Sequence, residues 1–283
     1  MRVKLLLLFL LAALSVSAQK GKPLFSGQPG LVSYTYRNYL SKDMPATLDS
    51  IKALGFKDME FSSLFGKTAA ELKALLDERG IQCSSFGVSY DDLVNKTDEV
   101  AQNAKILGAQ YVRVAGMPHK GALTLEEAKS AIADFNSIGQ LLKEQYGLTF
   151  IYHEHGFEFQ PYGQGTLFDY IVTKTNPIYV SFELDILWAF LPGQDPEAIL
   201  NKYGSRCRAL HLKDLKKGVP RGNLSGGTPQ DNDVVLGTGQ IDLPAILRSA
   251  KRAGIKHYYI EDESSNVLKQ VPQSIAYLKS LTQ

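Results

Sequence analysis

The stretch "TLEEAKSAIADFNSIGQLLKEQYG" (124–147), followed at once by "LTFIYHEH" (148–155), decides the fold. The first part has helical periodicity and begins with a capping box, Thr124 with Glu127. It ends at Gly147, and glycine commonly closes a helix. The second part is a short apolar run that becomes polar at its end, which is typical of a buried strand. Together they predict a helix that leads directly into a strand.

The same alternation of short strands and helices recurs along the chain. Further strands are predicted at 30–38, 56–63, 81–89, 109–116, 178–185, 207–214 and 257–263. Helical patterns separate them, and a last helix is predicted over 271–282. Eight such units predict an α/β fold, the (β/α)8 or TIM barrel. The alternative is an open doubly wound sheet, but "SYTYRNYLSKDM" (33–44) lacks the phosphate-binding glycine loop that such a sheet carries after its first strand.

The N-terminal residues 1–18, "MRVKLLLLFLLAALSVSA", have the parts of a secretory signal peptide. Arg2 and Lys4 precede a short apolar run, and small residues follow it. The run is too short to span a bilayer comfortably. We therefore predict cleavage of 1–18, export to the periplasm or the medium, no stable membrane insertion, and one domain over 19–283. A retained anchor helix is the alternative.

Charge and cysteine content exclude several classes of protein. Without Arg2 and Lys4 the formal net charge falls from +2 to zero, so nothing in the bulk charge favours nucleic acid or a membrane surface as partner. The two cysteines, Cys83 and Cys207, are too few for a disulfide scaffold. We predict two buried thiols, with a single bond as the alternative.

Polar residues gather at the strand ends where such barrels hold their active sites. Side chains alternate along a strand, and the apolar set should face the helices. This places His153, Asp185, His211 and Glu261 inward on the last four strands, a donor set suited to Mn²⁺, Co²⁺, Zn²⁺ or Fe²⁺ rather than Ca²⁺. A metal-free polar network is the alternative. Glu154 points to the other face, where it would support the site from behind by hydrogen bonding.

These residues lie in motifs that resemble the xylose isomerase-like TIM-barrel superfamily, the sugar isomerase/epimerase group with its inosose dehydratase-like branch. The resemblance runs from about Leu31 to the C-terminus. It rests on "YHEHGFEF" (152–159), "FELDILWAF" (182–190), "LHLKD" (210–214), "VLGTGQIDLPAIL" (235–247) and "YYIEDE" (258–263), in this order. It implies a metal-dependent sugar isomerase or epimerase that removes the α-proton of a keto-sugar and passes through an enediolate, with Mn²⁺ as the favoured ion.

One ligand position departs from the epimerase pattern. Family epimerases hold their ion with Glu, Asp, His and Glu. Asp185, His211 and Glu261 match the last three, but His153 stands at the first. Inosose dehydratase-like members also carry histidines at this strand end. The departure therefore favours the alternative reaction, a lyase that dehydrates its substrate or cleaves a 3-keto-glycoside by β-elimination.

The resemblance also implies roles for neighbouring side chains. Glu261 or His153 would act as the base, with His155 as a further candidate. Lys213 would donate a proton to the substrate or leaving group, or else form an ion pair with Glu183 or Glu263. The residues predicted to contact the substrate are Glu60, Arg113, His155, Glu183 and Trp188. Glu60 and Arg113 could instead fix each other, and Trp188 could pack a helix against the barrel rather than stack on a sugar.

The longest irregular segment, 216–240, follows the seventh predicted strand. We predict a lid over the mouth of the barrel, with a simple insertion as the alternative. Because phosphorylated sugars are mainly cytoplasmic, export favours a free sugar, an oligosaccharide or a keto-glycoside as substrate.

Two other functions compete with this prediction. An endonuclease IV-like phosphodiesterase would need more histidines than the five present, and export and neutral charge also argue against it. A non-catalytic carbohydrate-binding barrel would not need Asp185, His211 and Glu261 intact. We therefore predict an enzyme with a small carbohydrate as partner, and a homo-oligomer is compatible with such a barrel.

Overall fold

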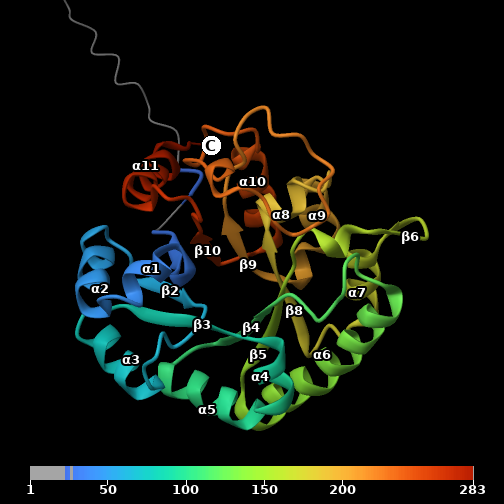
Figure 1. The fold of residues 1–283 in the computed structure, drawn as a ribbon, viewed down its shortest axis with the longest axis horizontal. Helices are drawn as coiled ribbons and strands as arrows, with labels where there is room; N and C mark the ends of the chain where they lie inside the picture. Colours follow the sequence, from blue (N-terminus) through green and yellow to red (C-terminus); the bar gives the residue numbers. More distant parts are fainter. Residues whose placement is uncertain (1–22, 26–27, 283) are drawn as a thin grey trace, which may run out of the picture.

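The computed structural model describes residues 23–25 and 28–282, so the predicted signal peptide lies outside the described residues. Parallel strands form a closed barrel in the order β1-β2-β3-β4-β5-β8-β9-β10, and helices surround it (Figure 1). The barrel strands are β1 (Gly30–Val32), β2 (Asp58–Phe61), β3 (Gln82–Val88), β4 (Tyr111–Ala115), β5 (Thr149–His153), β8 (Val180–Asp185), β9 (Cys207–Leu212) and β10 (His257–Ile260). The predicted (β/α)8 barrel is confirmed.

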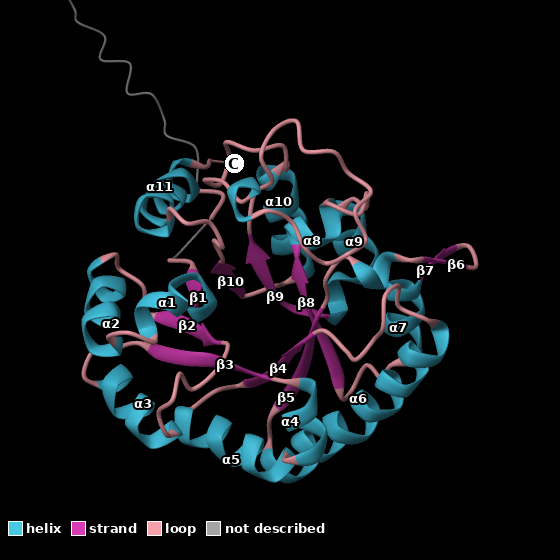
Figure 2. Ribbon diagram, in the orientation of Figure 1, coloured by secondary structure: helices cyan, strands magenta, loops and turns pink. Residues whose placement is uncertain are grey.

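The helices form an outer ring around the strands (Figure 2). They are α1 (Arg37–Leu40), α2 (Met44–Ala53), α3 (Ala69–Asp77), α4 (Tyr90–Asn95), α5 (Thr97–Leu107), α6 (Leu125–Tyr146), α7 (Leu167–Lys174), α8 (Ile186–Phe190), α9 (Pro196–Tyr203), α10 (Leu243–Ala253) and α11 (Val267–Ser280). A small hairpin of β6 (Pro161–Tyr162) and β7 (Gly165–Thr166) projects from the barrel before α7. Within the described part of the chain, no helix is long and apolar enough to cross a membrane.

Each of the eight predicted strands is present but shorter than predicted, and the first differs most. It ends at Val32 and continues as a 3-10 helix, η1 (Ser33–Tyr36), and then as α1. The Ser33 hydroxyl accepts a hydrogen bond from the backbone N–H of Ser62 at 2.8 Å, so the chain turns across the mouth of the barrel instead of extending. The predicted capping box of Thr124 and Glu127 is present.

Two further predictions concern the cysteines and the long loop. Cys83 and Cys207 are both buried free thiols, as predicted. The segment 216–240 is irregular apart from a short 3-10 helix, η4 (Gln230–Asn232), and it follows β9 at the C-terminal end of the barrel. Its role as a lid remains a prediction.

Apolar side chains on the outward face of each strand pack against the helices. On β5, Phe150 and Tyr152 are fully buried, and the Phe135 ring of α6 lies with its centroid 5.0 and 4.8 Å from theirs. Burying one such aromatic side chain contributes about 1.5–3 kcal/mol. The helix approaches the next strand closely at Gly139, where a Cβ atom would lie 2.6 Å from the backbone oxygen of Tyr179.

Replacing Gly139 with alanine should therefore destabilise the protein, although alanine favours helices. Overpacking costs about 1–3 kcal/mol, and the gain in helix propensity, about 1 kcal/mol, offsets only part of it. We expect Gly139→Ala to lower the free energy of unfolding by about 1–2 kcal/mol in urea denaturation. Ser137→Ala, on the exposed face of the same helix, is the control and should change stability by less than about 0.5 kcal/mol. Equal stabilities of the two variants would contradict the close contact.

Candidate functional site

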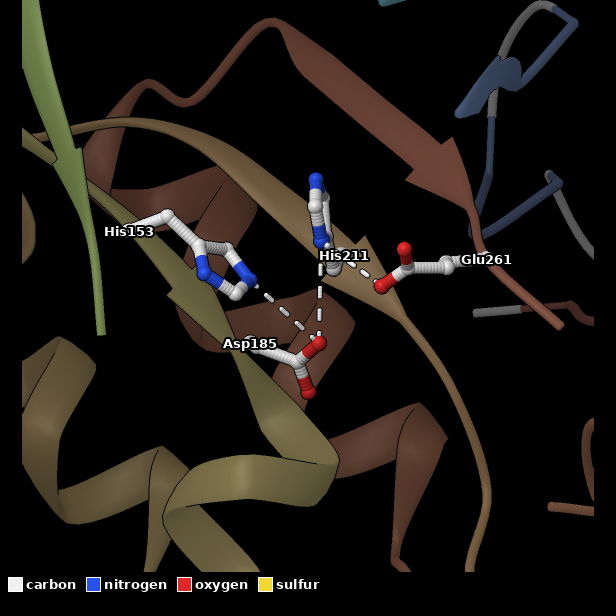
Figure 3. Close-up of side chains that lie close together, drawn as sticks. All are labelled: His153, Asp185, His211 and Glu261. Carbon is white, nitrogen blue, oxygen red and sulfur yellow. Dashed lines mark hydrogen bonds and ion pairs between the residues drawn. The ribbon is translucent and has the colours of Figure 1, made fainter. Parts of the chain in front are cut away.

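Four buried side chains meet at the C-terminal mouth of the barrel, as Figure 3 shows. They are the four predicted ligands, His153, Asp185, His211 and Glu261. One ligand atom from each lies within 4.8 Å of the others. The Nε2 atom of His153 is 3.5 Å from Oδ2 of Asp185, and Nδ1 of His211 is 3.6 Å from the same oxygen and 3.1 Å from Oε2 of Glu261.

The register of the strands and a helix cap explain this convergence. Asp185 and His211 are direct partners on β8 and β9 and so lie at equal depth. The Oδ1 atom of Asp185 caps α8, because it accepts hydrogen bonds from the backbone N–H groups of Leu187 at 2.8 Å and Trp188 at 3.0 Å. One carboxylate oxygen is thereby fixed, and Oδ2 is left to face the site.

The donor atoms of this cluster suit a divalent ion. Both ring nitrogens of His153 and Oδ2 of Asp185 are buried without a hydrogen-bond partner among the described residues. Such groups are costly to bury unpaired. Burial and the neighbouring His211 lower the pKa of His153, which keeps its ring neutral, the form that binds metals. The four residues therefore fit an ion such as Mn²⁺ or Zn²⁺.

His211 is oriented from the barrel interior by carboxylates. Its Nε2 donates to Oε1 of Glu60 at 3.0 Å and lies 3.0 Å from Oε2 of Glu183. Because Nε2 faces these carboxylates, Nδ1 of His211 faces the mouth of the barrel. A carboxylate behind a histidine orients the ring in the same way in many metal sites. Arg113 Nη2 is 2.9 Å from the same oxygen of Glu60, so Glu60 and Arg113 do fix each other.

Two predicted substrate contacts need correction. Glu60 and Glu183 are fully buried beneath His211 and do not line the cavity at the mouth. Strand alternation correctly predicted that both side chains point into the barrel, but alternation does not specify how far below the mouth they lie. Burial and the nearby Glu60 raise the pKa of Glu183 to about 7, whereas Arg113 and His211 outweigh burial at Glu60 and lower its pKa to about 2. Glu60 therefore keeps its negative charge to a lower pH than Glu183 does.

Glu154 lies outside the barrel wall, on the face that the alternation predicts. Its Oε1 accepts a hydrogen bond from the backbone N–H of Asp185 at 3.0 Å, so it ties β5 to β8 behind the site. Burial and the charge of Asp185 raise the pKa of Glu154 well above its usual value. A carboxyl held in this way supports Asp185 and does not face the four-residue cluster.

His155 continues the histidine face beyond the end of β5. Glu158 holds its backbone, accepting from the His155 N–H at 2.9 Å, and also accepts a short hydrogen bond from the hydroxyl of Tyr152. The ring of His155 stacks on Phe157, with centroids 5.8 Å apart and planes 8° apart. Its Nδ1 has no hydrogen-bond partner within the described part of the chain. The segment "YHEHGFEF" thus presents a positioned imidazole beside the cluster.

A cavity of about 590 Å³ opens over the cluster. Of the predicted substrate contacts, Arg113, His155 and Trp188 line it. Sequence reasoning missed the opposite wall, which is made by Tyr34, Arg37, Ser62, Ser63 and Phe65. Tyr34 and Arg37 lie in η1 and α1, where a strand was predicted, and Ser62, Ser63 and Phe65 lie in the loop after β2. Strand alternation therefore does not indicate which way these side chains point. Gly226, from the predicted lid segment, also lines the cavity.

Lys213 is buried in a group of carboxylates beside the cluster. Its Nζ is 3.2 Å from Oε2 of Glu261 and forms a short ion pair with Glu263, the alternative partner predicted for it. Within the residues described here it has no ion pair with Glu183. Asp233, whose Oδ2 is 3.8 Å from Nζ, was missed because it belongs to the irregular segment 216–240. This carboxylate also accepts from the backbone N–H of Glu263 at 2.9 Å, which joins the loop to the site.

Comparison with known proteins assigns the family. The sequence matches the xylose isomerase-like TIM barrel family over residues 48–281. The chain belongs to this family. Within it, the chain is similar to an inosose dehydratase of Lacticaseibacillus casei, with 25% identity over 253 residues, 80% of this chain and 83% of the relative.

Solved structures of xylose isomerase-like barrels agree with the fold. A sugar phosphate isomerase/epimerase of Parabacteroides distasonis superposes with a TM-score of 0.73 at 24% identity, covering 93% of this chain and 97% of that one. An IolI protein with a bound zinc atom superposes with a TM-score of 0.69 at 16% sequence identity, covering 89% of this chain and 95% of that one. The predictions of this family and of an enzyme are confirmed. The dehydratase relatives favour the lyase alternative over the isomerase.

The four-residue cluster should bind a transition ion. We expect the protein, loaded with Mn²⁺ and desalted, to keep roughly one ion per chain by elemental analysis. Asp185→Asn, which retains the oxygen that caps α8, and His153→Ala should each weaken binding by more than the roughly 10–100-fold that supporting contacts contribute.

Two variants serve as controls for this measurement. Asp195→Asn alters the equivalent cap of α9 away from the site and should keep the ion. Glu154→Gln should also keep it, because Glu154 faces away from the cluster. If Glu154→Gln lost the ion while His153→Ala kept it, the fifth-strand ligand would be Glu154 and not His153.

Proposed function

We propose that this protein is an exported, divalent-metal-dependent lyase that acts on a keto-sugar. It removes the proton next to the carbonyl and expels a substituent from the adjacent carbon. The observation that carries this proposal is the convergence of His153, Asp185, His211 and Glu261 under an open cavity. The inosose dehydratase relatives support elimination, in which the intermediate loses a substituent, over the reprotonation that an isomerase performs.

The donor set supports an ion of the Mn²⁺, Co²⁺, Zn²⁺ or Fe²⁺ class, and we propose Mn²⁺. When bound, such an ion polarises the carbonyl of the substrate and stabilises the negative charge that develops on its oxygen. The residues of the chain hold the ketone end of the sugar at the mouth of the barrel. Arg113 and Trp188, on the wall of the cavity, are placed to contact the rest of the ring.

Two observations support His155 as the base. Its Nδ1 has no hydrogen-bond partner among the described residues, and its ring lines the cavity without belonging to the four-residue cluster. Glu261 and His153, the bases first predicted, would have donor atoms engaged as ligands. Lys213, first predicted as the proton donor, does not line the cavity; its ammonium lies 3.2 Å from Glu261 and 5.2 Å from the ring of Trp188, so we propose that it balances the charge of Glu261 instead.

The reaction is tested by incubating the Mn²⁺-loaded protein with inosose and with 3-keto-glucosides in deuterated water. We expect loss of the α-proton signal in the NMR spectrum together with formation of an unsaturated ketone. His155→Asn should slow both by about 10²–10⁴-fold, the usual contribution of a general base. His257→Asn, a histidine at the start of β10 and outside the cavity, is the control and should leave both rates unchanged.

Two outcomes would overturn this assignment. Exchange of the α-proton with no elimination would identify an isomerase or epimerase. Absence of both exchange and elimination, with the ion bound, would leave a carbohydrate-binding barrel.

Export is tested separately, by expressing the full chain with a C-terminal tag and separating the cell fractions. We expect the protein outside the cytoplasm, with Gln19 as its first residue by N-terminal sequencing. Leu8→Arg interrupts the apolar run and should leave the chain uncleaved in the cytoplasm, because a signal peptide needs that run. Recovery of the unaltered chain in the cytoplasm with Met1 intact would contradict export.

A further inference from the structure

A charged residue on the wall of the cavity has no anionic partner. Arg37, the first residue of α1, lines the cavity over the four-residue cluster and is half-buried. Within the described part of the chain its guanidinium forms no ion pair, and its polar and ring contacts there are both with Tyr34. A partly buried charge without a counterion loses hydration that nothing replaces. Arg37 therefore presents an unbalanced positive charge to the cavity.

The other arginine and the carboxylates of the cavity wall are already paired. Nη2 of Arg113 lies 2.9 Å from Oε1 of Glu60. The carboxylates that line the cavity, those of Glu261 and Glu263, both form ion pairs with the buried Lys213. Among the described residues, no acid of the wall is left to pair with the guanidinium of α1. The counterion for this guanidinium is therefore expected from a ligand.

The guanidinium of Arg37 is held in place before any ligand binds. Its Nη1 donates a hydrogen bond to the backbone oxygen of Tyr34 at 2.8 Å, and its Cζ lies 4.1 Å from the centroid of the Tyr34 ring. Stacking on an aromatic face fixes the plane of the group and leaves its edge open. The edge has further N–H donors, and two parallel donors match the two oxygens of a carboxylate.

Arg37 and the proposed base come from opposite sides of the barrel. Arg37 follows β1, whereas His155 follows β5, and these two strands lie opposite each other in the closed barrel. Ser63, on the segment after β2, lines the same cavity, and its hydroxyl donates no hydrogen bond within the described residues. A substrate whose ketone lies at the four-residue cluster therefore extends its other end toward Arg37.

We propose that Arg37 determines specificity by binding a carboxylate of the substrate, so that the substrate is a keto-sugar acid. This inference rests on the proposed lyase function, because it concerns the same cavity. The carboxylate lies at the end of the sugar remote from the reacting ketone and accepts parallel hydrogen bonds from the guanidinium. Its one negative charge matches the one unbalanced cation. A phosphate carries a charge of about −1.5 to −2, and no second cation without a counterion lines the cavity among the described residues.

The test measures binding of three probes that have no ketone and so do not react. They are methyl glucoside, methyl glucuronide, which has a carboxylate in place of the hydroxymethyl group, and methyl glucoside 6-phosphate. By isothermal titration calorimetry we expect the Mn²⁺-loaded protein to bind methyl glucuronide at least about tenfold more tightly than the other two. Arg37→Gln should weaken binding of methyl glucuronide about 10–100-fold, the contribution of a hydrogen-bonded charge, and leave methyl glucoside unchanged.

Two further variants complete the comparison. Arg248→Gln makes the same change of charge on the exposed face of α10, outside the cavity, and should leave all three affinities unchanged. Arg37→Lys keeps the charge but lacks the paired donors, so we expect it to retain only part of the affinity for methyl glucuronide. It also serves as the second variant at this position if Arg37→Gln fails to fold.

The outcomes separate this inference from the proposed function. Equal affinities of Arg37→Gln and the unaltered protein for methyl glucuronide would overturn the carboxylate site, because the carboxylate would then bind elsewhere, such as at the metal ion. Tighter binding of the 6-phosphate, lost in Arg37→Gln, would also overturn it in favour of a phosphorylated sugar. Binding of methyl glucuronide that depends on Arg37, with no exchange or elimination of the α-proton in its 3-keto derivative, would overturn the lyase and leave the carboxylate site in place.

Discussion

The balance of buried charge around His211 is the constraint on which the site depends. Its imidazole separates two carboxylates in the barrel interior from two at the mouth. These are Glu60 and Glu183 inside, and Asp185 and Glu261 at the mouth. Buried charges require partners, and Arg113 and Lys213 supply the remaining cations. Burial would lower the pKa of His211, but the carboxylates raise it well above its usual value, so an ion bound at Nδ1 would displace a proton from this ring.

The mouth of the barrel has two chemically different halves. The ends of β5, β8, β9 and β10 provide the charged half, where the chemistry is proposed. The segments after β1 and β2 provide the other half, with hydroxyl and aromatic groups such as Tyr34, Ser62 and Phe65 beside a single charged residue, Arg37. A substrate whose reactive ketone faces the first half would place the rest of its length against the second.

The carboxylate of Asp214 connects two of the sequence motifs by hydrogen bonds. Asp214 ends "LHLKD", and its oxygens accept hydrogen bonds from the backbone N–H groups of Gly237, Gly239 and Ile241 in "VLGTGQI". A Cβ atom on Gly239 would lie 2.2 Å from Oδ1 of Asp214, so this position requires glycine. The contact closes the irregular segment 216–240 at its end, and Asp233 joins its middle to Lys213.

The sequence by itself determined the barrel and the four-residue cluster. Alternation along each strand has a period of two residues, so it identified the inward face and hence His153 and its three partners. Alternation specifies direction and not depth: Glu183 precedes Asp185 by two residues on β8, so it lies one layer deeper, beneath His211 and not in the cavity. Irregular segments have no period at all. The positions of Phe65 and Asp233 were therefore decided by tertiary structure, because the packing of loops against the mouth of the barrel determines where their side chains lie.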